Sequence, residues 1–233
     1  MLVLASMVKW TMAAAGLSGL AVAALLGIRQ PAMNDIRFRP VPVPDGSALL
    51  VMTREVTRRE WRACAAAGAC EDLTGSIPAA QRDMPMTGVN RFDVEAYLAW
   101  VNTQGRREYR LPTVAEWRAI ATELPRPGYR KLFADPRLAW AADYGSMPAI
   151  SGIIRPSGGF GTLSNGISDL GGNVWEWTAT CAKDGASPDR CPAFVVAGLH
   201  ETAMPVFVRD PFSGGCASGT PPNHVGFRLV TGD

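Results

Sequence analysis

The stretch Asp169–Trp177, which reads DLGGNVWEW, contains the residues that say most about the fold of this chain. Its two adjacent glycines allow backbone conformations that other residues avoid, so a tight turn is expected here. Trp175 and Trp177 bring two large aromatic rings to that turn, and such rings bury extensive apolar surface. Glu176 lies between them and would be costly to bury without a partner. The stretch therefore predicts a compact turn that encloses a carboxylate.

Two other stretches of similar character accompany it. Tyr109–Trp117 reads YRLPTVAEW, and Asn223–Arg228 reads NHVGFR. Together with Glu55–Thr57 (EVT), they resemble the formylglycine-generating enzyme family, also called the sulfatase-modifying factor-like domain, which is a variant of the C-type lectin fold. The resemblance covers about residues 45 to 230. It implies an α+β domain that is rich in loops, with short strands and about three short helices.

Three segments carry the signal of a helix start. In a capping box, a short polar side chain accepts a hydrogen bond from the backbone three residues on, and an acidic side chain there reaches back. Thr57–Glu60 and Thr113–Glu116 fit this pattern, and Asn90–Asp93 is a looser version. After the last of these, apolar residues recur at helical spacing and are expected to face a core. They are Val94, Tyr97, Leu98 and Val101.

The remaining composition agrees with short elements joined by turns. The 233 residues include 24 glycines and 18 prolines, and apolar residues make up 47% of the chain, enough for a sizeable core. An apolar run predicts a strand at residues 48–53, and Val225–Val230 predicts a closing strand. Brief apolar runs also occur at residues 194–197 and 206–208. The formal net charge of +2 gives no basic field, so no nucleic-acid partner is expected.

Residues 1–29 contain an apolar segment that suits a membrane. Trp10–Ile28 carries no charge and lies between Lys9 and Arg29. As a helix it would reach about 28 Å, close to the thickness of a bilayer's hydrocarbon core. We predict a retained single-pass transmembrane helix. A cleaved signal peptide, with Ala21–Ala23 (AVA) as its cleavage site, and a buried core helix are the alternatives.

The proline-rich residues 30–44 are predicted to form an extended linker. The domain itself is then expected to occupy residues 45–233.

Four of the five cysteines form two close pairs around loops. Cys64 and Cys70 enclose a short turn, and Cys181 and Cys191 bracket a polar loop. Neither pair has the C-x-x-C spacing of a metal or redox motif. We interpret both as local disulfides, with unpaired small core residues as the alternative. Cys216 is left over as a possible free thiol.

The cysteines also bear on the compartment, because disulfides persist in oxidising surroundings. Arg29, Arg37 and Arg39 follow the apolar segment, and the positive-inside rule would place them in the cytoplasm. The two predicted disulfides outweigh these arginines. The domain is therefore expected on the periplasmic side of the cytoplasmic membrane.

Members of the family hold a calcium ion at the GGNVWEW turn. By resemblance, Asp169 and Glu176 would be side-chain ligands, and Gly172 and Val174 would offer carbonyl oxygens. Oxygen ligands of this kind suit calcium. The alternative is that Glu176 pairs with an arginine or accepts hydrogen bonds from backbone amides. A second calcium site of the family has no clear match around residues 138–151.

Charged residues also lie inside stretches rich in tryptophan and leucine, at Arg110, Glu116 and Arg228. Glu116 is expected to cap its helix. Arg228 is expected to form a structural ion pair rather than to contact a substrate.

The enzyme of this family oxidises a cysteine of unfolded sulfatases through two cysteines that bind copper(I) and activate oxygen. Thiolates are suitable copper(I) ligands. In this chain the corresponding positions are Thr202 and Phe207, and neither side chain can replace a thiolate. Met204, His200 and Cys216 match no family pattern of metal ligands. Copper is therefore not expected.

A related branch of the family joins sulfur to histidine derivatives with non-heme iron. That chemistry needs several histidines, or two histidines and a carboxylate on one face. The chain has only His200 and His224, and the second lies inside the closing motif. Iron is therefore not expected either.

The signature stretches are intact while the cysteine pair is missing, which favours a role without catalysis. We predict a membrane-tethered accessory or binding subunit of a periplasmic or membrane protein complex, attached through residues 10–28 and bound to a protein partner. One alternative is an oxidoreductase of the formylglycine-generating type that modifies a protein cysteine. Another is a lectin-like surface binder, which is supported by fold-level analogy alone.

Overall fold

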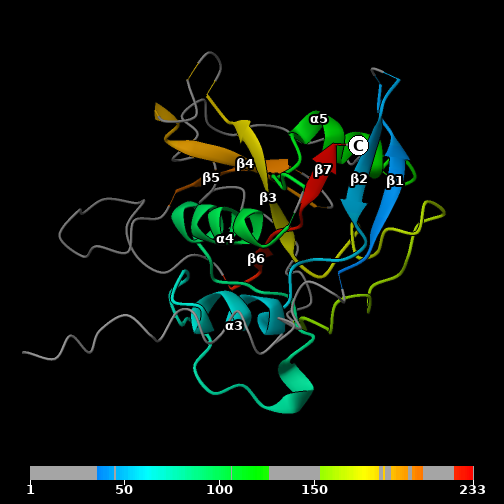
Figure 1. The fold of residues 1–233 in the computed structure, drawn as a ribbon. Coiled ribbons are helices and arrows are strands. Elements are labelled where there is room, and N and C mark those ends of the chain that lie inside the picture. Colours follow the sequence, from blue (N-terminus) through cyan, green and yellow to red (C-terminus); the bar gives the residue numbers. More distant parts are fainter. Residues whose placement is uncertain are drawn as a thin grey trace, which may run out of the picture. The chain divides into compact units, whose positions relative to one another are not determined.

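The structure is a computed structural model, and it describes residues 36–44, 46–105, 107–125, 153–183, 186, 190–198, 201–206 and 223–232. All of these lie in the second of two compact units of the chain, Ala32–Asp233. Their regular elements are two small β-sheets and three α-helices (Figure 1). The α+β class expected from the sequence is confirmed for this described part.

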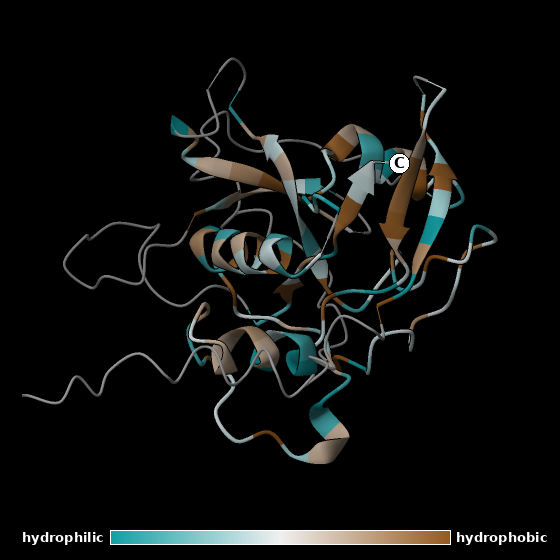
Figure 2. Ribbon diagram, viewed as in Figure 1, coloured by the Kyte–Doolittle hydropathy of each residue, from teal (hydrophilic) through white to brown (hydrophobic). Residues whose placement is uncertain are grey.

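The first sheet has three antiparallel strands in the order β1-β2-β7. β1 is Phe38–Pro42, β2 is Ala48–Met52 and β7 is Val230–Gly232. The expected strand at residues 48–53 is therefore present as β2. Figure 2 shows that β2 is mostly apolar, in keeping with its place at the centre of this sheet.

The second sheet is mixed, with the order β5-β4-β3-β6. β3 is Trp175–Cys181, β4 is Ala193–Ala197, β5 is Glu201–Pro205 and β6 is Val225–Gly226. β3 pairs antiparallel with β4 and parallel with β6. The apolar run at residues 194–197 lies in β4. β5 ends at Pro205, just before the apolar run 206–208, of which residues 207 and 208 lie outside the described residues.

All three predicted helix starts are confirmed. α3 is Arg58–Ala66, α4 is Arg91–Gln104 and α5 is Val114–Ile120, and each follows a capping box with both reciprocal hydrogen bonds. The looser Asn90–Asp93 version is as complete as the other two. A short 3-10 turn, Ala79–Gln81, lies between α3 and α4. The caps satisfy backbone amides that have no partner within the helix, which fixes where each helix begins.

The predicted apolar face of α4 is confirmed, with one residue less buried than the rest. Leu98 is partly buried and packs against the core, whereas the other three members are fully buried: Val94, Tyr97 and Val101. Tyr97 stacks on Trp61 of α3 and meets Phe227 edge-on. Aromatic contacts of this kind join the two helices to the C-terminal strands.

β1 lies inside residues 30–44, which the sequence predicts to be a linker. Phe38–Pro42 pairs with β2 along its whole length, so the linker prediction is wrong for these residues. Pro40 and Pro42 have no N–H to donate, and proline is tolerated in a sheet mainly on edge strands. Among the described strands β2 is the sole partner of β1. The prolines therefore mark an edge strand.

The predicted closing strand at Val225–Val230 is two strands in different sheets. β6 pairs with β3, and β7 pairs with β2. Arg228 lies between them and is completely buried. The chain leaves one sheet and joins the other around this residue, and the buried guanidinium has acceptors on both sides.

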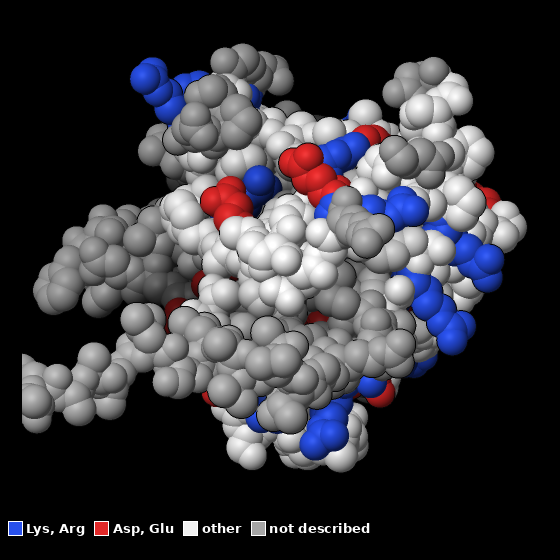
Figure 3. Space-filling view, viewed as in Figure 1, with Lys and Arg blue, Asp and Glu red and all other residues white. Residues whose placement is uncertain are grey.

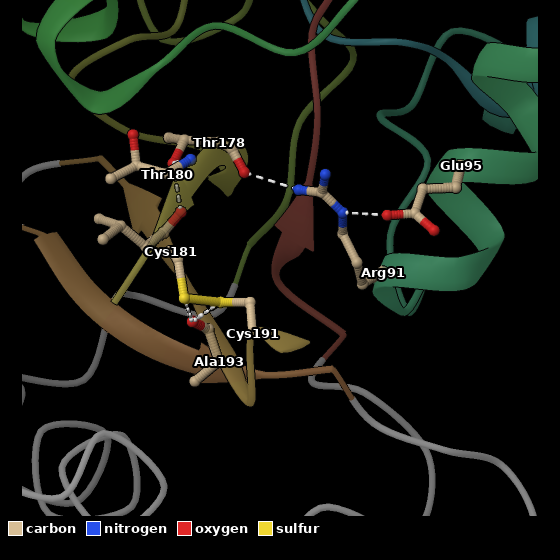
Figure 4. The surroundings of a disulfide bond; sticks show 8 residues. Arg91, Glu95, Thr178, Thr180, Cys181, Cys191 and Ala193 are labelled. Carbon is tan, nitrogen blue, oxygen red and sulfur yellow. Dashed lines mark hydrogen bonds and ion pairs between the residues drawn. A yellow bond between two sulfur atoms is a disulfide. The ribbon is translucent and has the colours of Figure 1, made fainter. Parts of the chain in front are cut away.

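Both predicted disulfides are present. Cys64–Cys70 ties α3 to the turn that follows it. Cys181–Cys191 joins the end of β3 to the start of β4, and both sulfur atoms lie beside the carbonyl oxygen of Ala193 (Figure 4). Each bond closes a short loop next to a regular element.

The predicted transmembrane segment, residues 10–28, lies outside the described residues. Of the helices that the structure does describe, none has both the length and the apolar character that a membrane crossing requires.

Candidate functional site

Glu176 lies in β3 and is almost completely buried. Its two carboxylate oxygens accept hydrogen bonds from Arg228, from Nε at 2.7 Å and from Nη2 at 2.6 Å. The indole Nε1 of Trp117 donates a third hydrogen bond at 3.1 Å. The expected structural ion pair of Arg228 is therefore confirmed, and the alternative in which Glu176 pairs with an arginine is the one observed.

Arg228 also donates to backbone carbonyls from two other parts of the chain. Nη1 donates to the oxygen of Met52 at 3.2 Å, and Nη2 donates to that of Ser168 at 2.9 Å. Burial alone would lower the pKa of Arg228, but the charge and hydrogen bonds of Glu176 outweigh it and raise that pKa. The guanidinium thus stays charged and links both sheets to the turn before β3.

The three signature stretches meet at this ion pair. Trp117 comes from YRLPTVAEW, Glu176 from DLGGNVWEW and Arg228 from NHVGFR. A bidentate arginine–carboxylate pair fixes both distance and orientation. One buried contact therefore brings together three motifs that lie far apart in the sequence.

Two residues of the turn adopt the left-handed conformation that favours glycine. Asp169 has φ 67° and Asn173 has φ 65°. The carboxylate of Asp169 accepts hydrogen bonds from the backbone N–H groups of Gly158 and Phe160. Asp and Asn tolerate this conformation better than most side chains do. Their side chains hold the preceding loop in place.

Asn173 connects that loop to Glu55, which precedes α3. Asn173 Oδ1 accepts from the backbone N–H of Arg155 at 3.0 Å, and Nδ2 donates to Glu55 Oε1 at 3.0 Å. Glu55 is completely buried. In the sequence, Glu55 stands out only as part of the EVT stretch. Its position as an acidic residue beside the apolar run at residues 48–53 is the one sign that it could be buried at a functional site.

Burial raises the pKa of Glu55 to about 8. The positive charge of Arg228 opposes this rise, whereas the negative charges of Asp169 and Glu176 add to it. Three carboxylates thus share one buried guanidinium.

The structure gives no support for the predicted calcium site at Asp169, Gly172, Val174 and Glu176. Arg228 neutralises Glu176, and Asp169 already accepts two amide hydrogen bonds. Both side chains predicted to bind the cation are therefore occupied by protein donors.

Of the two residues predicted at the family's cysteine positions, one lies in a described strand. Thr202 is buried on β5 opposite Val196 of β4, and Phe207 lies outside the described residues. Close by in the sheet, Gly198 packs so tightly against Trp175 that a Cβ atom would lie 2.3 Å from the indole. Trp175 in turn meets the ring of His224 edge-on. Burial lowers the pKa of His224.

The described residues offer no site for copper(I) or for iron, the two metals that the family uses in oxidation. Across the described ranges there is no group of three or more His, Cys, Asp or Glu side chains that could hold an ion. Cys64, Cys70, Cys181 and Cys191 are in disulfides and offer no thiolate. His200, Cys216 and Phe207 lie outside the described part, whereas Met204 is buried in β5.

The charged surface is organised by ion pairs around α5. Glu116 caps this helix as predicted, and it also pairs with Arg110 at 2.6 Å. Burial alone would raise the pKa of Glu116, but the ion pair and the capping hydrogen bonds outweigh burial and lower that pKa. Arg118 pairs with Glu201 at the start of β5. Figure 3 shows acidic and basic side chains lying side by side over the upper part of this face. Paired surface charges of this kind contribute little to binding or stability.

The amino-acid sequence is similar to one protein family and to several known proteins. A family model described as the sulfatase-modifying factor enzyme 1-like domain matches residues 29–232. The hercynine oxygenase of Mycobacterium tuberculosis is 28% identical over 158 residues, which are 64% of this chain and 32% of that protein. The hercynine oxygenase of Mycolicibacterium thermoresistibile is 32% identical over 105 residues, or 42% of this chain and 21% of that protein. The chain spans about a third or less of these relatives.

Solved structures are similar in fold. PvdO from Pseudomonas aeruginosa has a TM-score of 0.53 at 18% identity, over 85% of this chain and 92% of that one. Treponema denticola variable protein 1 has a TM-score of 0.53 at 17% identity, over 84% of this chain and 95% of that one. At such identities the likeness concerns the fold alone.

Proposed function

This chain belongs to the sulfatase-modifying factor enzyme 1-like family, and from that membership we propose that it takes part in an oxidation, as an oxidoreductase that modifies a cysteine thiol. The relatives named hercynine oxygenase support an oxidative role. They favour the alternative drawn from the sequence over the non-catalytic accessory subunit. The proposal concerns the class of reaction, since most of the length of those relatives has no counterpart here.

The observation that carries this proposal is the convergence of the three family stretches on Glu176 and Arg228. Trp117 of the first stretch also donates to Glu176, so all three stretches support the family membership on which the proposal rests. A thiol is proposed as the substrate group because the oxidation of a cysteine and the attachment of sulfur to a histidine derivative both start from sulfur. We derive no step through a metal, because no group of three or more metal-ligating side chains lies among the described residues, and His200 and Cys216 lie outside them.

The test is aerobic incubation of the purified full chain with a cysteine-containing peptide. Separate arms receive copper(I), iron(II) or a chelator, and one set is kept free of dioxygen. We expect a mass change at the peptide cysteine in a metal arm, and none in the chelated or anaerobic arms. An unmodified peptide in every arm, with the chain folded, would contradict an oxidase.

A matched pair of variants shows whether turnover depends on the domain. Glu176→Gln weakens the buried pair, whereas Glu108→Gln makes the same change at an exposed position. Turnover is expected to fall in the first and to persist in the second. Equal turnover in both would point to a contaminant or to free metal.

A binding subunit remains the second candidate because of one observation. Thr202 fills a position where the family enzyme has a metal-binding cysteine, and it is buried. If the chain binds rather than oxidises, a tagged full chain should bring down the same partner repeatedly from detergent-solubilised membranes, and the tagged partner should bring down the chain. Recovery of the chain alone would contradict this role.

We further propose a location outside the cytoplasm, with the chain tethered through residues 10–28. The two disulfides support it, since they persist in oxidising compartments. A thiol-alkylation assay on cells is the direct check. The four paired cysteines should resist alkylation until a reductant is added, and immediate alkylation would rule the location out.

A further inference from the structure

Three carboxylates surround Arg228, and they differ in how many hydrogen bonds they accept. Glu55, Asp169 and Glu176 are all buried, and all three attract the guanidinium. Glu176 holds Arg228 directly with two hydrogen bonds, and Asp169 accepts from two backbone amides. One positive charge cannot balance three negative charges in a site closed to water.

Glu55 is the least supported of the three. Its Oε1 accepts one hydrogen bond, from Asn173, and its Oε2 is buried with no hydrogen-bond partner. The neighbouring guanidinium of Arg54 does not help, because it pairs with Glu60 and donates only to the backbone oxygen of Glu55. An ionised oxygen without a donor is more costly to bury than a neutral acid.

We propose that Glu55 carries a proton in the folded domain at neutral pH, and that after loss of this proton the repulsion from Asp169 and Glu176 displaces Glu55 and so strains the brace that Asn173 forms between Glu55 and the loop before β3. The charged groups that face Glu55 are Arg228, Asp169 and Glu176. Two of these three repel an ionised Glu55, so deprotonation places a third negative charge in the same interior.

Asn173 passes a displacement of Glu55 on to the loop, because its side chain is hydrogen-bonded to Glu55 and to Arg155 at the same time. Nδ2 donates to Glu55 Oε1 at 3.0 Å and to the backbone oxygen of Arg155 at 3.3 Å. Oδ1 accepts from the N–H of Arg155 at 3.0 Å. Asn173 also has a left-handed backbone, with φ 65°, and these contacts help to hold its side chain in place. The loop 155–169 is therefore the first part expected to loosen.

The direction with pH follows from the raised pKa, which lies near 8 in the folded domain against an ordinary value of 4.5. Below the ordinary value Glu55 is protonated in both states, and its contribution to stability is fully present. Between the two values the unfolded chain has released the proton while the folded chain keeps it. Stability is therefore lost as the pH rises through this window, and the loss ends above the folded-state pKa.

The experiment compares thermal unfolding of the full chain with its Glu55→Gln variant from pH 5 to 9. Glutamine has the shape of a protonated glutamate and cannot ionise. The Tm of the wild type is expected to fall relative to the variant by about 3 °C per pH unit, up to about pH 8. Glu108→Gln, at an exposed position, is the control and should keep the wild-type pH dependence.

Hydrogen exchange supplies a second readout that does not depend on global unfolding. Amides of Gly158 and Phe160 should lose protection above pH 8 in the wild type, after correction for intrinsic exchange, and keep it in Glu55→Gln. Parallel Tm curves for the wild type and Glu55→Gln would overturn the proposal. So would unchanged protection of these two amides in the wild type from pH 6 to 9.

Discussion

At the residue scale, Arg228 is the side chain on which most contacts of the site depend. Replacing it with methionine leaves Glu176 buried without its charge partner, which typically costs about 3–5 kcal/mol. We expect Arg228→Met to lower the unfolding free energy by that amount in urea titrations. The matched change Arg110→Met removes a half-exposed ion pair and should cost less than about 1 kcal/mol.

The double variant Glu176→Gln/Arg228→Met separates the pair from its surroundings. Because it removes both charges of this ion pair, it should be less destabilised than the sum of the two single variants. Additive effects would mean that the two side chains do not depend on each other.

Gly198 gives a prediction about space rather than charge. A Cβ atom there would lie 2.3 Å from Cδ1 of Trp175, so the indole or the backbone has to shift. Gly198→Ala should cost about 1–3 kcal/mol by calorimetry or urea titration. Gly232→Ala, where a Cβ atom meets nothing within 4 Å, is the control and should be close to neutral.

Single residues also show what the sequence could and could not reveal. The two tryptophan neighbours of Glu176 indicate that it is buried at a cost, and the sequence allows an arginine as its partner. The choice of Arg228 depends on a chain crossing between two sheets, which no local pattern encodes. Glu55 went unrecognised because its partner, Asn173, is 118 residues away.

At the element scale, the Cys181–Cys191 disulfide fixes the connection between β3 and β4. Arg91 at the start of α4 donates to the backbone oxygen of Thr178 in β3 and also pairs with Glu95 (Figure 4). Changing both cysteines to alanine should lower stability by about 2–4 kcal/mol, because the unfolded chain gains freedom.

The Cys64–Cys70 pair is the natural comparison for that double variant. It closes a loop with a sequence separation of 6, against 10 for the other bond, and should contribute slightly less. Thermal unfolding with and without a reductant checks both bonds. A Tm unchanged by either double variant would show that the loops are already held without sulfur.

Elements that depend on local chemistry were predicted well. The three helices begin at their capping boxes because neighbouring side chains alone satisfy the first amides. Elements whose identity depends on distant partners were not predicted well. β1 resembled a linker because of its prolines, and β6 and β7 resembled one strand because no local pattern marks the change of sheet between them.

At the scale of the whole molecule, the family and fold followed from three short stretches, and the function did not. The stretches predict how the scaffold is closed, since they meet in one buried contact. They do not specify the reacting groups, because the family's thiolate position holds the buried Thr202. Relatives named as oxygenases therefore guide the proposed chemistry more than any side chain does.

The mass of a cysteine-containing peptide after incubation with the folded full chain, dioxygen and an added metal tests the central claim most directly. An oxidoreductase predicts a product whose mass differs at the cysteine and whose amount grows with chain concentration. A peptide that keeps its original mass with both copper(I) and iron(II), while the chain stays folded, would contradict it.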